Sequence, residues 1–143
     1  MKKILLFLFI APLLAFSQQE TRREYYESGR LLSIINYTDG VREGSCKYFY
    51  DYGAWAIKTS LNYKNGKLIG SSKTYYKNGQ VEHEGNYKYS EKGVYSRKEG
   101  VWKTYYNSGE VQVEITYDEN GKALDYKSLE KDGSIIPMPE GGC

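Results

Sequence analysis

The chain has 143 residues, of which 40% are hydrophobic, 15% aromatic and 27% charged. Its 20 basic and 18 acidic residues leave a formal net charge of +2. A chain of this length suits one domain, and so small a net charge gives no electrostatic reason to expect a nucleic acid or an anionic membrane surface as the partner.

Residues 1–17 predict a cleaved signal peptide. Lys2 and Lys3 precede an almost wholly apolar run over 4–14, and Ala15 and Ser17 put small side chains at the positions that a signal peptidase reads. We therefore expect export by a Sec-type route to the periplasm, the outer surface or the medium. Removal of the two lysines leaves 18 basic and 18 acidic residues, so we expect no strong affinity for a membrane surface.

After a short lead over 18–23, the chain repeats itself. A segment that reads Gly-x-x-Lys-x-aromatic-Tyr, followed by a turn and a glycine, occurs three times, and a partial copy over 25–29 precedes it. Such a repeat predicts stacked supersecondary units. All 16 tyrosines follow the signal peptide, and their half-polar rings suit a thin, half-exposed sheet. The full copies begin at Gly44, Gly70 and Gly100, and the turn glycines are Gly29, Gly53, Gly79 and Gly109.

The strand expected after each of these turns alternates between apolar and polar residues. Val111, Val113 and Ile115 alternate with polar neighbours, and 55–63 and 81–87 repeat the pattern. Alternation of this period marks a strand with one buried and one wet face. Further turns are expected at 38–40, 64–66 and 119–121. Because no helical period follows residue 17, we predict an all-β fold.

The length of the turn after each tyrosine pair decides which side chains share a face. A two-residue turn at Asn78-Gly79 would place Tyr76 opposite Val81. In the last unit, it would group Trp102, Thr104 and Tyr106 with Val111, Val113 and Ile115. A three-residue loop with a bulge would instead group Val101, Lys103 and Tyr105 with them. The second arrangement buries a lysine, so we expect the two-residue turn.

The last unit also carries a recognisable motif. It reads Gly-x-Trp-Lys-x-Tyr-Tyr-x-x-Gly from Gly100, followed by an alternating strand that ends in Tyr117 and an Asn-Gly turn. This pattern resembles the bacterial variant of the MORN repeat, and the resemblance covers 24–121. The match is weaker in the first two units, where Cys46 stands in the place of Trp102 and the turn at 51–53 is irregular.

The resemblance implies an elongated, antiparallel, single-layer twisted sheet of successive β-hairpins. Bacterial proteins of this kind often carry an antitoxin label, and eukaryotic relatives act as scaffolds. After the repeats, 122–137 is expected to form capping strands with a turn at 131–133, and 138–143 a loose tail.

The residues that could carry chemistry are few. His83 is the one histidine, and we expect it to pack among aromatic side chains as a strand residue. Glu82, Glu84 and Glu114 could supply a carboxylate pair, but a half-exposed sheet also needs a solvated strand face with Glu and Lys, and we favour this explanation. We therefore expect no enzyme, no cofactor and no metal site.

The two cysteines leave two readings open. An oxidising compartment allows a disulfide between Cys46 and Cys143. Otherwise, Cys46 is a small apolar residue of a strand and Cys143 a free or intermolecular thiol.

One insertion interrupts the repeat. Gly70 comes seven positions after Tyr63, but Gly100 comes thirteen positions after Tyr87. Insertions in repeats often project from the binding face, and this one supplies side chains that are favoured at interfaces. The candidate partner-binding residues are Tyr89, Tyr95 and Arg97. The alternative is a longer hairpin without a role.

The sequence thus favours an exported, non-catalytic protein–protein interaction or scaffold module, with an envelope or secreted protein as its partner. A carbohydrate-binding module of the envelope is one alternative, with Tyr75, Tyr105 or Trp55 stacking on sugar rings. An antitoxin or immunity protein that binds a toxin is the other, and it follows from the resemblance alone.

Overall fold

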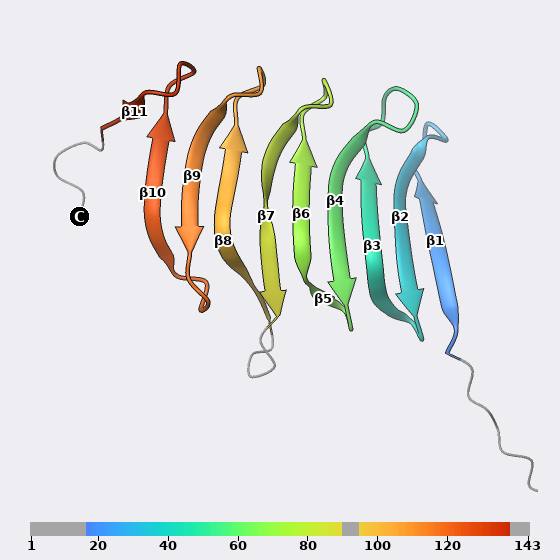
Figure 1. Ribbon diagram of the computed structural model, residues 1–143. Coiled ribbons are helices and arrows are strands. Elements are labelled where there is room, and N and C mark those ends of the chain that lie inside the picture. Colours follow the sequence, from blue (N-terminus) through green and yellow to red (C-terminus); the bar gives the residue numbers. More distant parts are fainter. Residues whose placement is uncertain (1–16, 90–94, 138–143) are drawn as a thin grey trace, which may run out of the picture.

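The computed structural model describes residues 17–89 and 95–137, which form one open antiparallel sheet of 11 strands (Figure 1). Ten strands lie side by side in chain order, and the short β5 pairs with β4 beside this path. The described residues contain no helix, and hence none that is long and apolar enough to span a membrane. The predicted all-β, antiparallel fold is confirmed, whereas residues 1–16 of the predicted signal peptide and the tail over 138–143 lie outside the described residues.

Most strands are short and are joined by tight turns. Their bounds are β1 Gln19–Tyr25, β2 Leu31–Thr38, β3 Val41–Phe49, β4 Ile57–Lys64, β5 Lys67–Leu68, β6 Gly70–Tyr75, β7 Val81–Tyr89, β8 Ser96–Tyr105, β9 Val111–Tyr117, β10 Ala123–Leu129 and β11 Ile135–Ile136. β1 begins within the expected lead, and β10 and β11 occupy the segment expected to cap the repeats.

Residues paired across neighbouring strands point to the same side, so the register defines two faces of the sheet. One side, the apolar face, carries Ile35, Cys46, Leu61, Trp102 and Ile115. The other side, the charged face, carries a row with one residue from each of nine strands. That row is Arg23, Ile34, Lys47, Ser60, Lys73, Glu84, Lys103, Glu114 and Lys127.

The turn after each tyrosine pair differs from the predicted one. The Tyr76 N–H donates to the Gln80 carbonyl oxygen at 2.8 Å, which closes a three-residue loop with Gly79 at φ 88°. The Gly79 N–H donates in turn to the Tyr76 carbonyl oxygen, and the turns at 27–29 and 107–109 are closed by the two equivalent bonds. The predicted two-residue turn is therefore wrong, and Gln80 rather than Val81 lies opposite Tyr76.

A β-bulge just beyond the turn restores the predicted register. Tyr105 lies opposite Val111, but the register then shifts, so that Thr104 lies opposite Val113. The bulge adds one residue to the second strand, which compensates for the change in register caused by a three-residue rather than a two-residue turn. The predicted grouping of Trp102 and Thr104 with Val113 and Ile115 is confirmed. The inclusion of Val111 in this group is wrong, because the bulge pairs Val111 with Tyr105 on the other side of the sheet rather than with Tyr106.

The repeat glycines mark a second set of bulges. Gly44, Gly70 and Gly100 have φ of 77°, 66° and 67°, which glycine adopts without a steric penalty. Near Gly44, the pairing jumps from Ile35–Cys46 to Tyr37–Arg42, so that β3 holds two extra residues. A jump of the same size occurs in β8 around Gly100. The first residue of the motif is therefore a glycine because of the backbone of the bulge.

The second tyrosine of each pair connects one unit to the next. In all four units its hydroxyl donates to a backbone carbonyl oxygen at the equivalent position of the following unit. These bonds are Tyr26 to Phe49 at 2.7 Å, Tyr50 to Tyr75 at 2.6 Å, Tyr76 to Tyr105 at 2.7 Å and Tyr106 to Leu129 at 3.0 Å. In the last turn Glu130 stands in the place of this tyrosine, so the series ends there.

Few side chains are deeply buried because the sheet has a single layer. Among the described residues, the buried hydrophobic ones are Ile35, Cys46 and Phe49, which are 3%, 1% and 4% exposed. Trp102 packs over the backbone of Gly85, where an added Cβ would lie 2.2 Å from the indole. Packing on such a sheet therefore consists of contacts between neighbouring strands rather than of one central core.

Candidate functional site

His83 is an exposed strand residue, and no carboxylate of the described residues lies within hydrogen-bond distance of its ring. It lies in β7 with a side chain that is 47% exposed, so the predicted strand position is confirmed and the predicted packing among aromatic rings is wrong. Its Nδ1 lies 2.9 Å from Thr104 Oγ1, and its Nε2 lies 3.9 Å from a carboxylate oxygen of Glu82. The second distance is too long for the hydrogen bond that orients a catalytic imidazole.

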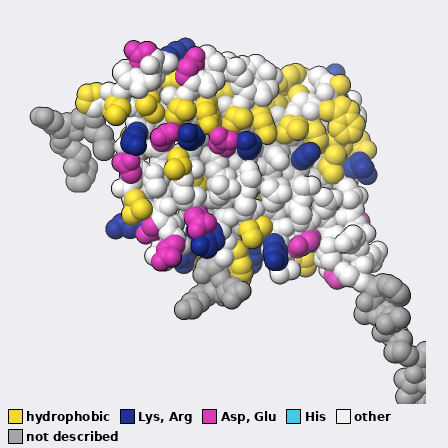
Figure 2. Space-filling view, in the orientation of Figure 1, with side chains coloured by type: hydrophobic (Ala, Val, Ile, Leu, Met, Phe, Trp, Pro, Cys, Tyr) yellow, Lys and Arg dark blue, Asp and Glu magenta, His cyan; other side chains and the backbone are white. Residues whose placement is uncertain are grey.

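The carboxylates of the charged face are bound by lysines from the strand before them. Lys73 Nζ lies 2.8 Å from Glu84, and Lys103 Nζ lies 3.0 Å from Glu114. Figure 2 shows these charges as an alternating row across the sheet, beside a band of hydrophobic side chains. Lys103 lies between Glu84 and Glu114 in this row, and each carboxylate is paired with a lysine, as expected of a solvated strand face.

Glu84 also binds a tyrosine of the next unit. The Tyr105 hydroxyl donates to its carboxylate, which shows that the first tyrosine of this pair points to the charged face. The hydrogen bonds from Lys73 and then from Tyr105 lower the pKa of Glu84. Burial, and next the bond to Glu84, raise the pKa of Tyr105 to about 12. A carboxylate held ionised by two donors is poorly suited to act as a general acid.

Metal and thiol chemistry find little support in the described part of the chain. Residues 17–89 and 95–137 contain no group of three or more His, Cys, Asp or Glu that could hold a metal ion. Cys46 of β3 has no disulfide partner among the described residues, and burial raises the pKa of its thiol. Cys143 lies outside the described residues, so its disulfide with Cys46 stays a prediction.

The predicted binding residues lie where the hairpin of β7 and β8 extends beyond its neighbours. Tyr89 lies opposite Ser96 and is half-buried, whereas Tyr95 is 61% exposed. The Arg97 guanidinium lies 5.2 Å from the centre of the Tyr95 ring. The structure therefore brings Tyr95 and Arg97 together at an exposed position, while 90–94 lie outside the described residues.

A second exposed aromatic site lies at the N-terminal end of the sheet. Tyr50 N–H bonds to the Ala56 carbonyl oxygen, which closes a five-residue loop over 51–55, two residues longer than the other loops after tyrosine pairs. Trp55 lies in this loop at φ 64°, and β4 begins only at Ile57. The prediction that Trp55 shares a strand and a face with Leu61 is therefore wrong.

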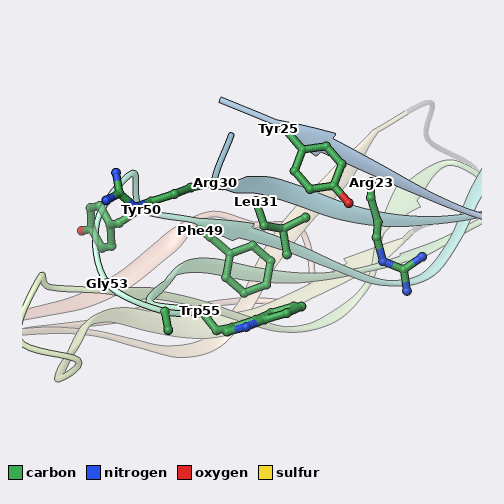
Figure 3. A pocket seen from close by; sticks show the side chains of 9 residues that line it. Arg23, Tyr25, Arg30, Leu31, Phe49, Tyr50, Gly53 and Trp55 are labelled. Carbon is green, nitrogen blue, oxygen red and sulfur yellow. The ribbon is translucent and has the colours of Figure 1, made fainter. Parts of the chain in front are cut away.

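The Trp55 ring forms one wall of a hollow of about 340 Å³, which we call the Trp55 hollow. It packs edge-on against Phe49, with ring centres 5.8 Å apart and planes at 87°. Figure 3 shows Leu31, Phe49 and Trp55 together in the centre, with Tyr25 beside them. Two arginines flank this apolar centre on opposite sides, Arg23 and Arg30. The irregular turn at 51–53 was the sequence signal that marked this place.

The three rings considered for sugar stacking differ in exposure. Trp55 is 66% exposed, but Tyr75 and Tyr105 are half-buried, and Tyr105 is bound to Glu84. A row of free tyrosine rings is therefore not present at these positions, and Trp55 is the accessible one of the three.

The MORN repeat variant matches residues 21–39, 68–89 and 98–119. These matches include the partial first copy, and they leave out 40–67, where Cys46 and the longer loop over 51–55 lie. No curated protein and no solved structure matches the chain. Repeats of this family are non-enzymatic and generally serve in interactions with proteins or membranes. The chain therefore contains three MORN repeat variants, as its repeated motif predicts.

Proposed function

We propose that this protein is an exported, non-catalytic module that binds another protein of the envelope or the medium. The observation that carries the proposal is the charged face. It combines a row of ordered charges with exposed aromatic side chains, among which Tyr25 and Trp55 are 59% and 66% exposed. Aromatic and arginine side chains dominate the energetics of protein interfaces.

Lysine-directed cross-linking tests this proposal. The chain without residues 1–17 is incubated with envelope extract, cross-linked and analysed by mass spectrometry. We expect one partner protein, cross-linked to lysines of one face of the sheet. An excess of the chain without the cross-linker attached should compete with this partner and abolish the cross-links. Cross-links to many proteins that persist when excess chain is added would refute the proposal.

The same experiment locates the docking surface. The variant Tyr95→Ser with Arg97→Ser removes the exposed pair of the β7–β8 hairpin, and Tyr126→Ser with Lys122→Ser is a matched control in and before β10. Loss of the partner in the first variant alone would assign docking to the insertion. Retention of the partner by both variants would assign docking to another part of the charged face.

The exposed ring of Trp55 favours carbohydrate binding as the second candidate. Saturable retention on peptidoglycan, lost in Trp55→Ser, would support it over protein binding. An antitoxin role differs from the first proposal only in the identity of the partner, and a toxin as the cross-linked protein would support it.

A further inference from the structure

We infer that the Trp55 hollow is the docking site for an acidic protein segment that inserts a large apolar or aromatic side chain. This inference rests on the proposed function and adds the place and the chemistry of the contact.

The lining of the hollow suits one large apolar side chain. Phe49 forms its floor and is 4% exposed, while the rims formed by Tyr25 and Trp55 are 59% and 66% exposed. A volume of about 340 Å³ is small for a ligand pocket, but it accepts a single anchoring residue. Buried aromatic or aliphatic anchors of this kind often dominate binding.

The loop that carries Trp55 is unlike its counterparts. Its two extra residues place Trp55 at φ 64°, a left-handed conformation that a bulky side chain adopts only at a cost in free energy. Strained backbone of this kind clusters at binding sites. Glycine would adopt this conformation without strain, so the backbone alone does not explain a tryptophan at this position.

The charge around the hollow favours an acidic partner. In the later units, Lys73 and Lys103 are each paired with a glutamate of the following strand. In the first two units no glutamate stands at this position. Ile34 lies opposite Arg23, and Ser60 lies opposite Lys47. Within the described part of the chain, the side chains of Arg23 and Lys47 consequently have no carboxylate partner.

Arg30 adds a third cation on the other side of the hollow. Its Nη1 lies 3.6 Å from Asp51, with 54% of the side chain exposed, so this exposed pair is weak and open to exchange. Carboxylates on either side of an inserted apolar residue would therefore meet positive charge at both rims (Figure 3). A neutral sugar would leave these cations without partners.

Synthetic peptides test the inference on the chain without residues 1–17. The probe is a fluorescein-labelled peptide with one central phenylalanine between aspartate and glutamate residues, and binding is followed by fluorescence anisotropy. We expect saturable binding that weakens about tenfold or more when the phenylalanine becomes alanine, and again when the acidic residues become lysines. No binding, or equal binding of the three peptides, would overturn the inference.

Variants of the protein place the contact. Trp55→Gly removes the anchor wall and relieves the backbone, and Arg23→Gln with Lys47→Gln removes the two cations without carboxylate partners. Each is expected to weaken binding of the acidic peptide about tenfold, whereas Lys127→Gln, at the far end of the same row, leaves it unchanged. Equal loss in Lys127→Gln would show unspecific charge attraction and would overturn the site.

Two further outcomes separate this inference from the proposed function. If the cross-linked partner is retained by Trp55→Gly and lost by Tyr95→Ser with Arg97→Ser, the hollow is excluded and the binding function stands. If vesicles of anionic phospholipid bind the chain and the acidic peptide does not, the inferred protein ligand is wrong. Absence of any competed partner would refute the proposed function itself.

Discussion

Glu84 joins three neighbouring strands through its side chain. It lies in β7, accepts a hydrogen bond from Lys73 of β6 at 2.8 Å and another from the Tyr105 hydroxyl of β8. Its side chain is 30% exposed, so solvent weakens the ion pair, but two donors at one carboxylate are worth more than an isolated surface pair. Glu84 therefore has a structural role.

We expect Glu84→Gln to lower the free energy of unfolding by about 1 kcal/mol at neutral pH. Because the folded state lowers the pKa of Glu84 below its ordinary value of 4.5, its contribution is present above that pH and is lost as the pH falls below it. Urea unfolding of both proteins across this range should therefore show a difference that narrows in acid. The control Glu114→Gln removes only the ion pair with Lys103 and should lower the free energy of unfolding by less. A difference that does not change with pH would contradict this explanation.

At the scale of the hairpin, the repeat glycines set the path of the backbone. Gly100 lies at φ 67° in β8, and an added Cβ would have no neighbour within 4 Å. The requirement for glycine is therefore conformational and not steric. Gly85 is the opposite case, since it lacks a positive φ and leaves room for the Trp102 ring.

Gly100→Ala should therefore destabilise the protein by about 1–2 kcal/mol, the cost of a left-handed residue with a Cβ. Gly100→Asn should cost less, because asparagine tolerates this conformation better. Thermal and urea unfolding measure both, with Val101→Ala at an exposed neighbouring position as the control. Equal stability of the alanine variant and the original protein would show that the bulge can change shape.

At the scale of the whole molecule, stability depends on contacts between adjacent units. A single-layer sheet has no central core, so each unit is supported by its neighbours, as in other repeat proteins. The tyrosine hydroxyls cross these boundaries, and Tyr76 links the N-terminal half, which contains Trp55, to the half that contains Trp102. The two tryptophans of the chain therefore report on opposite sides of this link.

Tyr76→Phe should cost about 1 kcal/mol and should also weaken the coupling between the two halves. Urea unfolding is followed by fluorescence in Trp102→Phe and Trp55→Phe backgrounds, each of which retains one tryptophan. We expect coincident midpoints before the change and separate midpoints after it. Tyr106→Phe, near the C-terminal end, should leave the midpoints together. Equal shifts at both probes in Tyr76→Phe would argue against coupling through this bond.

The sequence by itself determined the all-β fold, the order of the strands and the composition of most of the apolar face. Alternation and turn residues are local signals, and the repeat shows them several times, so Trp102 and Thr104 could be grouped correctly with Val113 and Ile115. The turn itself was predicted wrongly, because Lys77-Asn78-Gly79 is compatible with two loop lengths. The bulge that restores the register has no local signal.

Only the tertiary structure decided what depends on side chains that are distant in the sequence. The hydroxyl of each second tyrosine meets a carbonyl of the following unit, and the Trp55 hollow combines β1, the start of β2, the end of β3 and the loop over 51–55. Likewise, the lack of carboxylates opposite Arg23 and Lys47 emerges from the pairing register. The repeat thus specifies the scaffold through local patterns, while the surface that makes this chain distinct arises from contacts across strands.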